Sequence, residues 1–472
     1  MRILITEEAL QSGKGHWLNY IQGIAEGFRA VDDHIDVLVH RNATDAVIDQ
    51  VGGTRWFSRN CWHDKASQGW IGGIRHNLTF RRELAGCLGA HEPYDWVCAL
   101  TMRLQHLLAF ALLARRQKKF SVFSGSVSRK HSDTPSPSTT GPLKAQPSLL
   151  GLDHSTAALD PRPSTFDPSS APRFLLLFVQ GFGRYAGHGM PTEFPLNGST
   201  LLARSCFWLM RGAVQKGSVV LAAETKGMQD ELHRFTGLPV RLFPHPIQSL
   251  KKVDRPSTLA PRPSTPITLT CPGFARHEKG SDLLQEAIKS ILAKSGRQDS
   301  GVRSQESGAT QLPVHISPLG REVRFVLQWP EAFVMPDGTI LGPDPALLND
   351  PRVEFLNRNL PMDEYQALLA RTDLVILPYR RNSYHNRVSR VSIEAAGRGI
   401  PLIYTSGTWS GEVADTAGGG VPILDETSEA VAVAISIAIA QFDELKEKAS
   451  KGAVNVSRFH SVGTFRDGLV GV

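Results

Sequence analysis

The sequence predicts an α/β protein made of two doubly wound domains with a cleft between them. With 472 residues, the chain is longer than a domain with a single hydrophobic core usually is. Apolar runs of strand length alternate with amphipathic helical segments, and this alternation stops near residue 247 and starts again at 267. Strands that are apolar throughout are typical of parallel sheets covered by helices on both faces, so each half is expected to be Rossmann-like.

The first series of strands and helices fills residues 1–247. Leu18, Ile21, Ala25 and Phe28 fall on one face of the helix that starts at Trp17, which is the spacing of a helix packed against a sheet. The predicted strands of this half are 2–6, 35–40, 94–101, 173–180, 218–225 and 240–247, and the further predicted helices are 104–115, 201–210 and 226–235.

The second series fills residues 267–445 and repeats the same alternation. Its predicted strands are 267–273, 322–328, 353–357, 374–379 and 401–405. Its predicted helices are 281–293, 362–371, one that begins near Val388 and contains Glu394, and one that begins near Ser428. We expect these elements to form the C-terminal domain.

Three stretches are too polar and too rich in proline, serine or glycine to build a core. Residues 124–172 and 296–320 are expected to be disordered loop insertions, and residues 248–266 a lengthened interdomain linker. The pentapeptide PRPST occurs at 161–165 and again at 261–265, which indicates a compositional bias and not a functional repeat.

Charge and cysteine content narrow the range of partners. The formal charge of +7 favours anionic partners, but it is not gathered into one block, so a nucleic-acid-binding arm is not expected. The five cysteines are scattered without a C-x-x-C pair, and no D-x-D occurs, so no metal site or disulfide framework is predicted. The longest nearly apolar stretch, 430–440, is far shorter than the roughly 20 residues of a spanning helix. A cytoplasmic protein is expected.

The stretch 374–401 carries the clearest sign of a binding site. A buried strand at 374–379 is followed by a loop and a helix, and in open α/β sheets ligands bind where strands end. The helix start, Arg387 and Ser389 suit a diphosphate, and Glu394 suits two adjacent ribose hydroxyls. The alternative is an ordinary surface helix that ends in a glycine cap.

Two other loops follow strands in the same way. Arg276 and Lys279 come after the strand that ends at Cys271, and two cations there suit a departing pyrophosphate, although a solvated basic loop is the alternative. Gly13 and Gly15 permit a tight turn after the first strand, and His16 is a hydrogen-bond donor to a substrate or a structural histidine. Leu18 stands where the third glycine of a dinucleotide-binding turn would be, so no nicotinamide cofactor is indicated.

Together these stretches resemble the retaining, GT-B-fold glycosyltransferases of family four, the group-1 class that uses nucleotide sugars. The glycine turn, the R-x-x-K-G segment at 276–280 and the LPY…Y-x-x-R-x-S…E-A-x-x-x-G-x-P-L-I segment at 377–403 occur in the family's order. Residues 394–401 are the most specific piece, and the N-terminal half matches mainly in layout.

The resemblance implies roles for particular residues. Lys279 and Arg276 would hold the diphosphate, and Glu394 the nucleotide ribose. The other donor-side residues that it implies are Tyr384, Asn386, Arg387, Ser389, Gly13, Gly15 and His16. Two positions depart from the family: Asn386 stands where the first glutamate of the E-x7-E motif would be, and Gln180 where a histidine near the donor sugar is frequent.

The acceptor side is expected in the N-terminal half, with Gln180 and the tryptophan-rich stretch 54–73. No clean helical or strand period joins Trp56, Trp62 and Trp70, and exposed tryptophans suit stacking on a sugar ring or contact with an anionic membrane at its inner face. Trp62 and Trp70 are the acceptor-side candidates. The alternative is a satellite cluster packed under the loop. The resemblance further implies that residues 446–472 cross back onto the N-terminal domain.

The function implied is transfer of a sugar from a nucleoside-diphosphate sugar to a hydroxyl of a glycan, lipid or small molecule. Transfer would retain the anomeric configuration and need neither metal nor cofactor, because the C-terminal cations stabilise the leaving group. The rival functions are a nucleotide-sugar epimerase or a phosphorylase of the same architecture, and a nucleotide-sugar-binding protein without catalysis.

Overall fold

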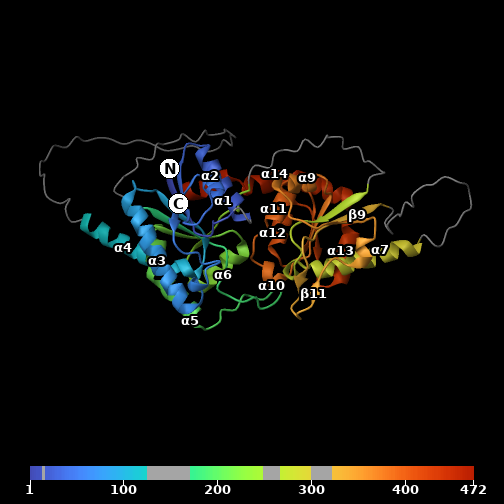
Figure 1. The fold of residues 1–472 in the computed structure, drawn as a ribbon, viewed down its shortest axis with the longest axis horizontal. Coiled ribbons are helices and arrows are strands. Elements are labelled where there is room, and N and C mark those ends of the chain that lie inside the picture. The colour runs from blue at the N-terminus through green and yellow to red at the C-terminus, as the bar shows by residue number, and fades with distance from the viewer. Residues whose placement is uncertain (13–15, 125–170, 248–265, 299–320, 472) are drawn as a thin grey trace, which may run out of the picture.

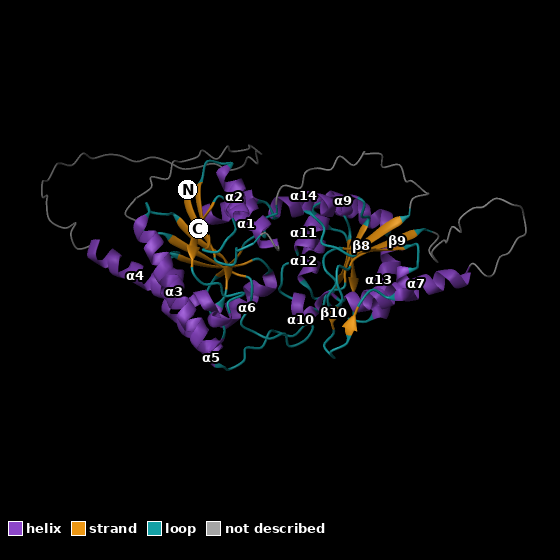
Figure 2. Ribbon diagram, viewed as in Figure 1, coloured by secondary structure: helices purple, strands orange, loops and turns teal. Residues whose placement is uncertain are grey.

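The computed structural model describes residues 1–12, 16–124, 171–247, 266–298 and 321–471. Most of the stretches predicted as insertions or linker (124–172, 248–266 and 296–320) lie outside the described residues. Figure 1 shows two α/β domains side by side, and Figure 2 shows helices on both faces of each sheet. The predicted fold class, two Rossmann-like domains, is confirmed.

The N-terminal domain is built on a seven-stranded sheet in the order β3-β2-β1-β4-β5-β6-β7. The strands, which are parallel throughout, are β1 (Arg2–Glu7), β2 (His34–His40), β3 (Gly53–Phe57), β4 (Trp96–Met102), β5 (Arg173–Phe178), β6 (Val219–Ala223) and β7 (Val240–Leu242). The helices are α1 (His16–Arg29), α2 (Asp45–Val51), α3 (Gly69–Ala90), α4 (Leu104–Ser124), α5 (Gly198–Gln215) and α6 (Lys226–Thr236).

Both faces of this sheet are buried, which explains why its strands are apolar throughout. In β4, Val97 and Ala99 belong to the core cluster beneath α3, α4 and α5, while Trp96 and Cys98 belong to the cluster beneath α1. The chain order reverses between β1 and β4, so the loops that leave these two strands border a crevice at the carboxyl edge of the sheet.

The C-terminal domain has a six-stranded parallel sheet in the order β12-β9-β8-β13-β14-β15. Its strands are β8 (Ile267–Cys271), β9 (Val323–Gln328), β12 (Val353–Leu356), β13 (Leu374–Leu377), β14 (Leu402–Thr405) and β15 (Gly420–Ile423); β10 (Phe333–Val334) and β11 (Ile340–Leu341) form a separate hairpin. Its helices are α7 (Ser281–Gln298), α8 (Pro345–Leu348), α9 (Met362–Ala370), α10 (Arg381–Tyr384), α11 (Arg390–Ala396), α12 (Trp409–Ala417), α13 (Ser428–Ala440) and α14 (Phe442–Phe459). The order reverses between β8 and β13, the two strands whose following loops the sequence singled out.

The end of the chain packs on the N-terminal domain. Helix α15 (Val462–Val470) lies against α1, where Phe465 is 1% exposed and its ring centroid is 6.3 Å from that of Phe28. Arg466 pairs with the buried Asp33 at 2.6 Å between Nε and Oδ2. None of the helices in the described part of the chain combines the length and apolarity needed to cross a membrane.

Several elements differ from the sequence-based prediction. The tryptophan-rich stretch 54–73, predicted as a loop, contains β3 and the start of α3. The elements that were not predicted are α2, α3, α8, α10, α12, α14, α15, β3, β10, β11 and β15. The helix that contains Glu394 begins at Arg390, two residues later than expected. Helix α3 has five glycines in 22 residues, and this lowers its helical propensity enough to hide it from a pattern search.

Candidate functional site

The loops after β8 and β13 meet at the carboxyl edge of the C-terminal sheet. Gly280 lies between a short 3₁₀ turn (His277–Lys279) and α7, with φ of +64°. A Cβ atom on Gly280 would lie 1.9 Å from the carbonyl oxygen of Pro378, so only glycine allows this close approach of the two loops. The backbone N–H of Arg380 also donates to the carbonyl of Glu278 at 2.9 Å.

Three cations, Arg276, Lys279 and Arg387, gather where these loops meet. Lys279 is buried enough that its pKa is lowered from 10.5 to about 8, and the positive charges of Arg276 and Arg387 contribute to this. Among the described residues, no carboxylate forms an ion pair with Lys279 or Arg387. Arg276 lies 3.4 Å from Glu278 and is half exposed. The cluster therefore has positive charge that the described protein does not neutralise, which suits an anionic ligand.

Two neighbouring arginines, Arg380 and Arg381, differ from this cluster because protein groups already accept their hydrogen bonds. Arg380 pairs with Asp282 at 2.5 Å and with Glu426 at 3.7 Å. Arg381 is buried and donates through Nε to the carbonyl of Ser406 at 2.6 Å and through Nη2 to the carbonyl of Leu424. Their contacts hold the loop after β13 against the rest of the domain.

Glu394 is more buried than the sequence suggested. Only 2% of the residue is exposed, and both carboxylate oxygens accept hydrogen bonds: Oε2 from the Tyr365 hydroxyl at 2.7 Å and Oε1 from Arg390 Nε at 2.7 Å. A ribose would therefore share this carboxylate with two protein donors. A carboxylate has about four acceptor positions, so sharing is chemically permitted.

Ser389 and Tyr384 are also engaged by the protein. Ser389 is the N-cap of α11, and its hydroxyl accepts from the backbone N–H of Ser392 at 3.3 Å. Tyr384 is 6% exposed, and its ring stacks on Tyr379 with centroids 4.1 Å apart. Arg387 lies over the Tyr384 ring at 5.1 Å, so this tyrosine supports a member of the cation cluster.

Asn386 faces the N-terminal domain. Its Nδ2 donates to Glu231 Oε2 at 2.7 Å, and its carbonyl accepts from the Thr225 hydroxyl at 2.9 Å. Glu231 and Thr225, at α6 and just before it, were not predicted as site residues. The loop between β5 and α5 reaches the same region (Figure 1), and the ring centroid of Tyr185 lies 5.0 Å from that of His385.

The site residues predicted in the N-terminal domain, on the donor side and on the acceptor side, are only partly described. Gly13 and Gly15 lie outside the described residues; His16 begins α1, and Trp70 lies near the start of α3, but the side chains of these two residues are also outside what is described. Gln180 follows β5, and its Oε1 accepts from Arg103 Nη2 at 2.8 Å. Arg103 in turn lies 3.5 Å from the centroid of the half-buried Trp62 ring. The structure thus brings Gln180 and Trp62 together through Arg103, which the sequence analysis missed.

A buried polar cluster lies at the carboxyl end of β1, near Trp62. Glu8 faces His76 Nε2 at 2.9 Å and His106 Nε2 at 3.2 Å, and it accepts from the Cys61 backbone N–H at 2.7 Å. Burial alone would raise the pKa of Glu8, but the two histidines lower it well below its usual range. Glu8 thereby holds the loop that carries Trp62.

The neighbouring Glu7 has the opposite character. It accepts from the Thr101 hydroxyl at 2.9 Å and is fully buried. Burial raises the pKa of Glu7 from 4.5 to about 8, so this carboxyl is mostly protonated at neutral pH. The two adjacent glutamates are thus held in different charge states by their surroundings.

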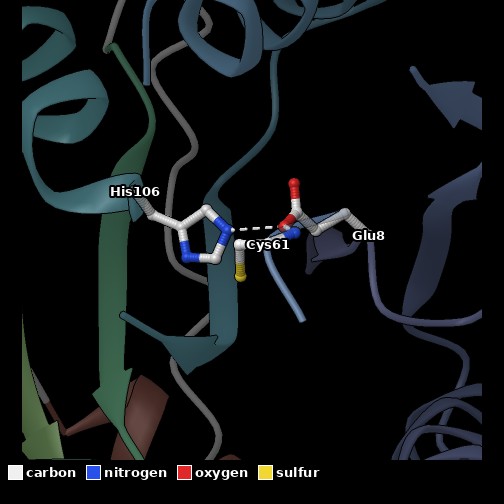
Figure 3. A group of neighbouring side chains, drawn as sticks. All are labelled: Glu8, Cys61 and His106. Carbon is white, nitrogen blue, oxygen red and sulfur yellow. Dashed lines mark hydrogen bonds and ion pairs between the residues drawn. The ribbon is translucent and has the colours of Figure 1, made fainter. Parts of the chain in front are cut away.

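In the described part of the chain, Glu8, Cys61 and His106 form a group whose ligand atoms lie within 4.8 Å of one another, close enough for a metal ion (Figure 3). By type these ligands suit zinc. However, His106 Nδ1 accepts from the Arg103 backbone N–H at 3.3 Å, so the ring proton is on Nε2, the atom that faces Glu8. The group therefore fits a hydrogen-bonded cluster better than a metal centre.

The fold is similar to that of solved glycosyltransferases. A glycosyltransferase from Rickettsia africae has a TM-score of 0.58 at 12% identity, with 99% of this chain and 97% of that chain covered. Anabaena Alr3699/HepE in complex with UDP has a TM-score of 0.53 at 13% identity, with 100% and 99% covered. The lipopolysaccharide outer core galactosyltransferase WaaB has a TM-score of 0.52 at 12% identity, again with 100% and 99% covered.

A scan against protein-family models and a search of curated proteins found no match. At the identities of the solved structures, the similarity shows a common GT-B-like fold, in which two Rossmann-like domains follow one another along the chain.

Proposed function

We propose that this protein is a glycosyltransferase that moves a sugar from a nucleoside-diphosphate sugar to an acceptor hydroxyl, with retention of configuration. The observation that carries the proposal is the cation cluster of Arg276, Lys279 and Arg387, which lies at the switch point of the C-terminal sheet. Open α/β sheets bind ligands at that point, and a diphosphate is the anion that suits three converging cations.

The chemistry follows from where this charge lies. When the bond between the anomeric carbon and the diphosphate oxygen breaks, its electron pair goes to the phosphate, and Lys279 and Arg387 stabilise the added charge. The acceptor oxygen attacks the anomeric carbon from the same side as the leaving group, and its proton passes to the departing phosphate. Electrostatic stabilisation of this kind is often the largest catalytic contribution, and the reaction needs neither an enzymic nucleophile nor a metal ion.

The nature of the nucleotide is suggested by one similar structure. HepE was solved in complex with UDP and with UDP-glucose, and the proposed site of this chain lies in a domain of the same fold. A uridine nucleotide is therefore the first donor class to test. An epimerase would convert the donor without any acceptor and a phosphorylase would require inorganic phosphate, so reactions run without acceptor and with phosphate separate these functions from transfer.

Titration of the protein with UDP, GDP and ADP by calorimetry tests the proposal. We expect one of them to bind, and Lys279→Ala to weaken binding by about 1.5–3 kcal/mol, the range for a hydrogen bond to a charged group. Arg276→Ala should weaken it less, because Arg276 is half exposed and lies beside Glu278. Arg324→Ala is the matched control, since Arg324 is a surface cation paired with Glu354. Unchanged affinity in Lys279→Ala would remove this residue from the site.

A further inference from the structure

Glu231 is a buried carboxylate of the N-terminal domain that contacts the proposed donor loop of the C-terminal domain. It is 1% exposed and lies on α6. Its Oε1 accepts from the backbone N–H groups of Phe182 and Gly183 at 2.8 and 2.9 Å. A Cβ atom on Gly181 would lie 2.0 Å from the same oxygen, so the loop after β5 is wrapped closely around this carboxylate.

The second oxygen of Glu231 fixes the orientation of Asn386. Oε2 accepts from Asn386 Nδ2 at 2.7 Å, between residues 155 positions apart in the chain. The Asn386 backbone is held from the same side, because the Thr225 hydroxyl donates to its carbonyl at 2.9 Å. An amide that donates Nδ2 to a carboxylate turns its Oδ1 away from that carboxylate. Among the described residues, no hydrogen bond is made to Asn386 Oδ1.

The chemistry of this pair accounts for the asparagine. A glutamate or aspartate at 386 would place a second carboxylate within hydrogen-bond distance of Glu231, and two such charges repel unless one is protonated. An asparagine converts this repulsion into a charge-assisted hydrogen bond. It also leaves a single free side-chain atom, Oδ1, which is an acceptor as a carboxylate oxygen would be.

We propose that Glu231 is a positioning residue that orients Asn386 so that Oδ1 accepts a hydrogen bond from a hydroxyl of the donor sugar. Asn386 directly precedes Arg387 of the cation cluster, so it belongs to the same loop as the proposed diphosphate site. Glu231 itself is buried and acts through Asn386. The inference rests on the proposed function, and it assigns recognition of the sugar, separately from the nucleotide, to a contact between the two domains.

The test compares the affinity for a nucleoside diphosphate with that for its glucose conjugate, using UDP and UDP-glucose first and the GDP and ADP pairs next. In Glu231→Gln, the new amide still accepts from Phe182 and Gly183 through its oxygen, but its NH₂ group faces Asn386 Nδ2, so Asn386 turns around. We expect the affinity for the sugar nucleotide to fall about fivefold, the size of one hydrogen bond, while the affinity for the diphosphate is unchanged.

Matched variants separate positioning from a structural role. Asn386→Ala should give the same loss as Glu231→Gln. The exchange Glu231→Gln with Asn386→Asp keeps the shape of the pair, lets Gln donate to Asp, and again presents an oxygen to the sugar, so the lost affinity should return. Asp230→Asn removes the same charge from an exposed position of α6 and should change neither affinity.

Three results would overturn the inference. Equal loss of both affinities, no loss at all, or an exchange variant that fails to recover the sugar affinity would each make Glu231 a structural residue only. If the wild-type protein binds no nucleotide of the three pairs, the proposed function fails and this inference fails with it. That outcome differs from the others, in which the diphosphate still binds.

Discussion

Lys279 holds its charge in surroundings that disfavour it. Burial and two nearby arginines lower its pKa to about 8, and a bound diphosphate would reverse this by supplying the missing negative charge. In the free protein, the positive charge of Lys279 is therefore in an unfavourable position, and a bound anion would stabilise it. Perturbed pKa values of this kind are common at functional sites, where a charged group serves to bind a ligand and does not stabilise the fold.

The lowered pKa predicts how nucleotide binding depends on pH. Only the protonated lysine attracts the diphosphate, and in the free protein this form is lost as the pH rises through about 8. Affinity should therefore fall by about tenfold between pH 7 and pH 9. Calorimetry across this range with wild type and Lys279→Met checks the prediction. The same decline in the methionine variant would show that another group titrates.

Glu394 differs from Lys279 because its charge is already paired within the protein. It was predicted to bind the ribose, but it accepts hydrogen bonds from Tyr365 and Arg390. Replacement by glutamine leaves the Arg390 guanidinium without its charged partner, so we expect a loss of about 1–3 kcal/mol in the free energy of unfolding. A ribose role predicts, in addition, that wild type prefers the ribonucleotide to its 2′,3′-dideoxy analogue and that Glu394→Gln loses this preference.

Thermal unfolding and titration with both nucleotides measure the two effects separately. Tyr365→Phe serves as the control, since it removes one donor to Glu394 and leaves the carboxylate in place. If Glu394→Gln unfolds at a lower temperature and keeps the preference for the ribonucleotide, Glu394 is a structural residue.

At the scale of elements, the apolar strands and the loops after β8 and β13 were predictable because each is encoded in a short run of residues. The burial of Glu394 was not, because it depends on Tyr365, which is 29 positions away on α9. The Asn386–Glu231 and Arg103–Gln180 contacts join residues that are 155 and 77 positions apart, and no local period indicates such pairs. Helix α3 was hidden by its glycines, and it brings His76 to Glu8.

The segment between β3 and α3 carries a prediction about the acceptor. Trp62 is half buried, its ring lies against Arg103, and its centroid is 6.1 Å from that of Trp17. Trp62→Ala would free Arg103 and Gln180 from their present positions, so transfer to an acceptor should fall while donor binding is retained. Trp208→Ala is the control, because Trp208 is 73% exposed on α5. Parallel loss of donor binding and thermal stability would instead identify Trp62 as part of the core.

At the scale of the whole molecule, the chain crosses between the domains twice, once after Ile247 and once after α14. In the described part of the chain, residues at these two crossings are hydrogen-bonded to each other. Ile247 donates its backbone N–H to the carbonyl of His460 at 3.0 Å, and His460 Nδ1 lies 3.1 Å from the carbonyl of His245. His245 also contacts Glu224 at 2.9 Å, next to the end of β6. Any rotation of one domain against the other must be accommodated at this junction.

Helix α15 extends this junction into the N-terminal core, and this predicts which part of the protein Phe465 stabilises. Phe465 is 1% exposed between Phe28 and Phe243, so Phe465→Ala should lower the free energy of unfolding by about 3–5 kcal/mol, the usual range for a buried phenylalanine. Val470→Ala is the control in the same helix, because Val470 is 57% exposed.

The loss should appear in the N-terminal domain, although Phe465 lies near the C-terminal end of the sequence. A nucleotide bound to the C-terminal domain stabilises the unit that holds it, since it binds the folded form alone. If heating resolves two transitions, Phe465→Ala should therefore lower the transition that the nucleotide does not raise. A lowering of the nucleotide-stabilised transition alone would mean that α15 contributes to the C-terminal domain. If the domains unfold in one step, the variant should lower the midpoint with and without nucleotide by similar amounts, because α15 then stabilises a single cooperative unit.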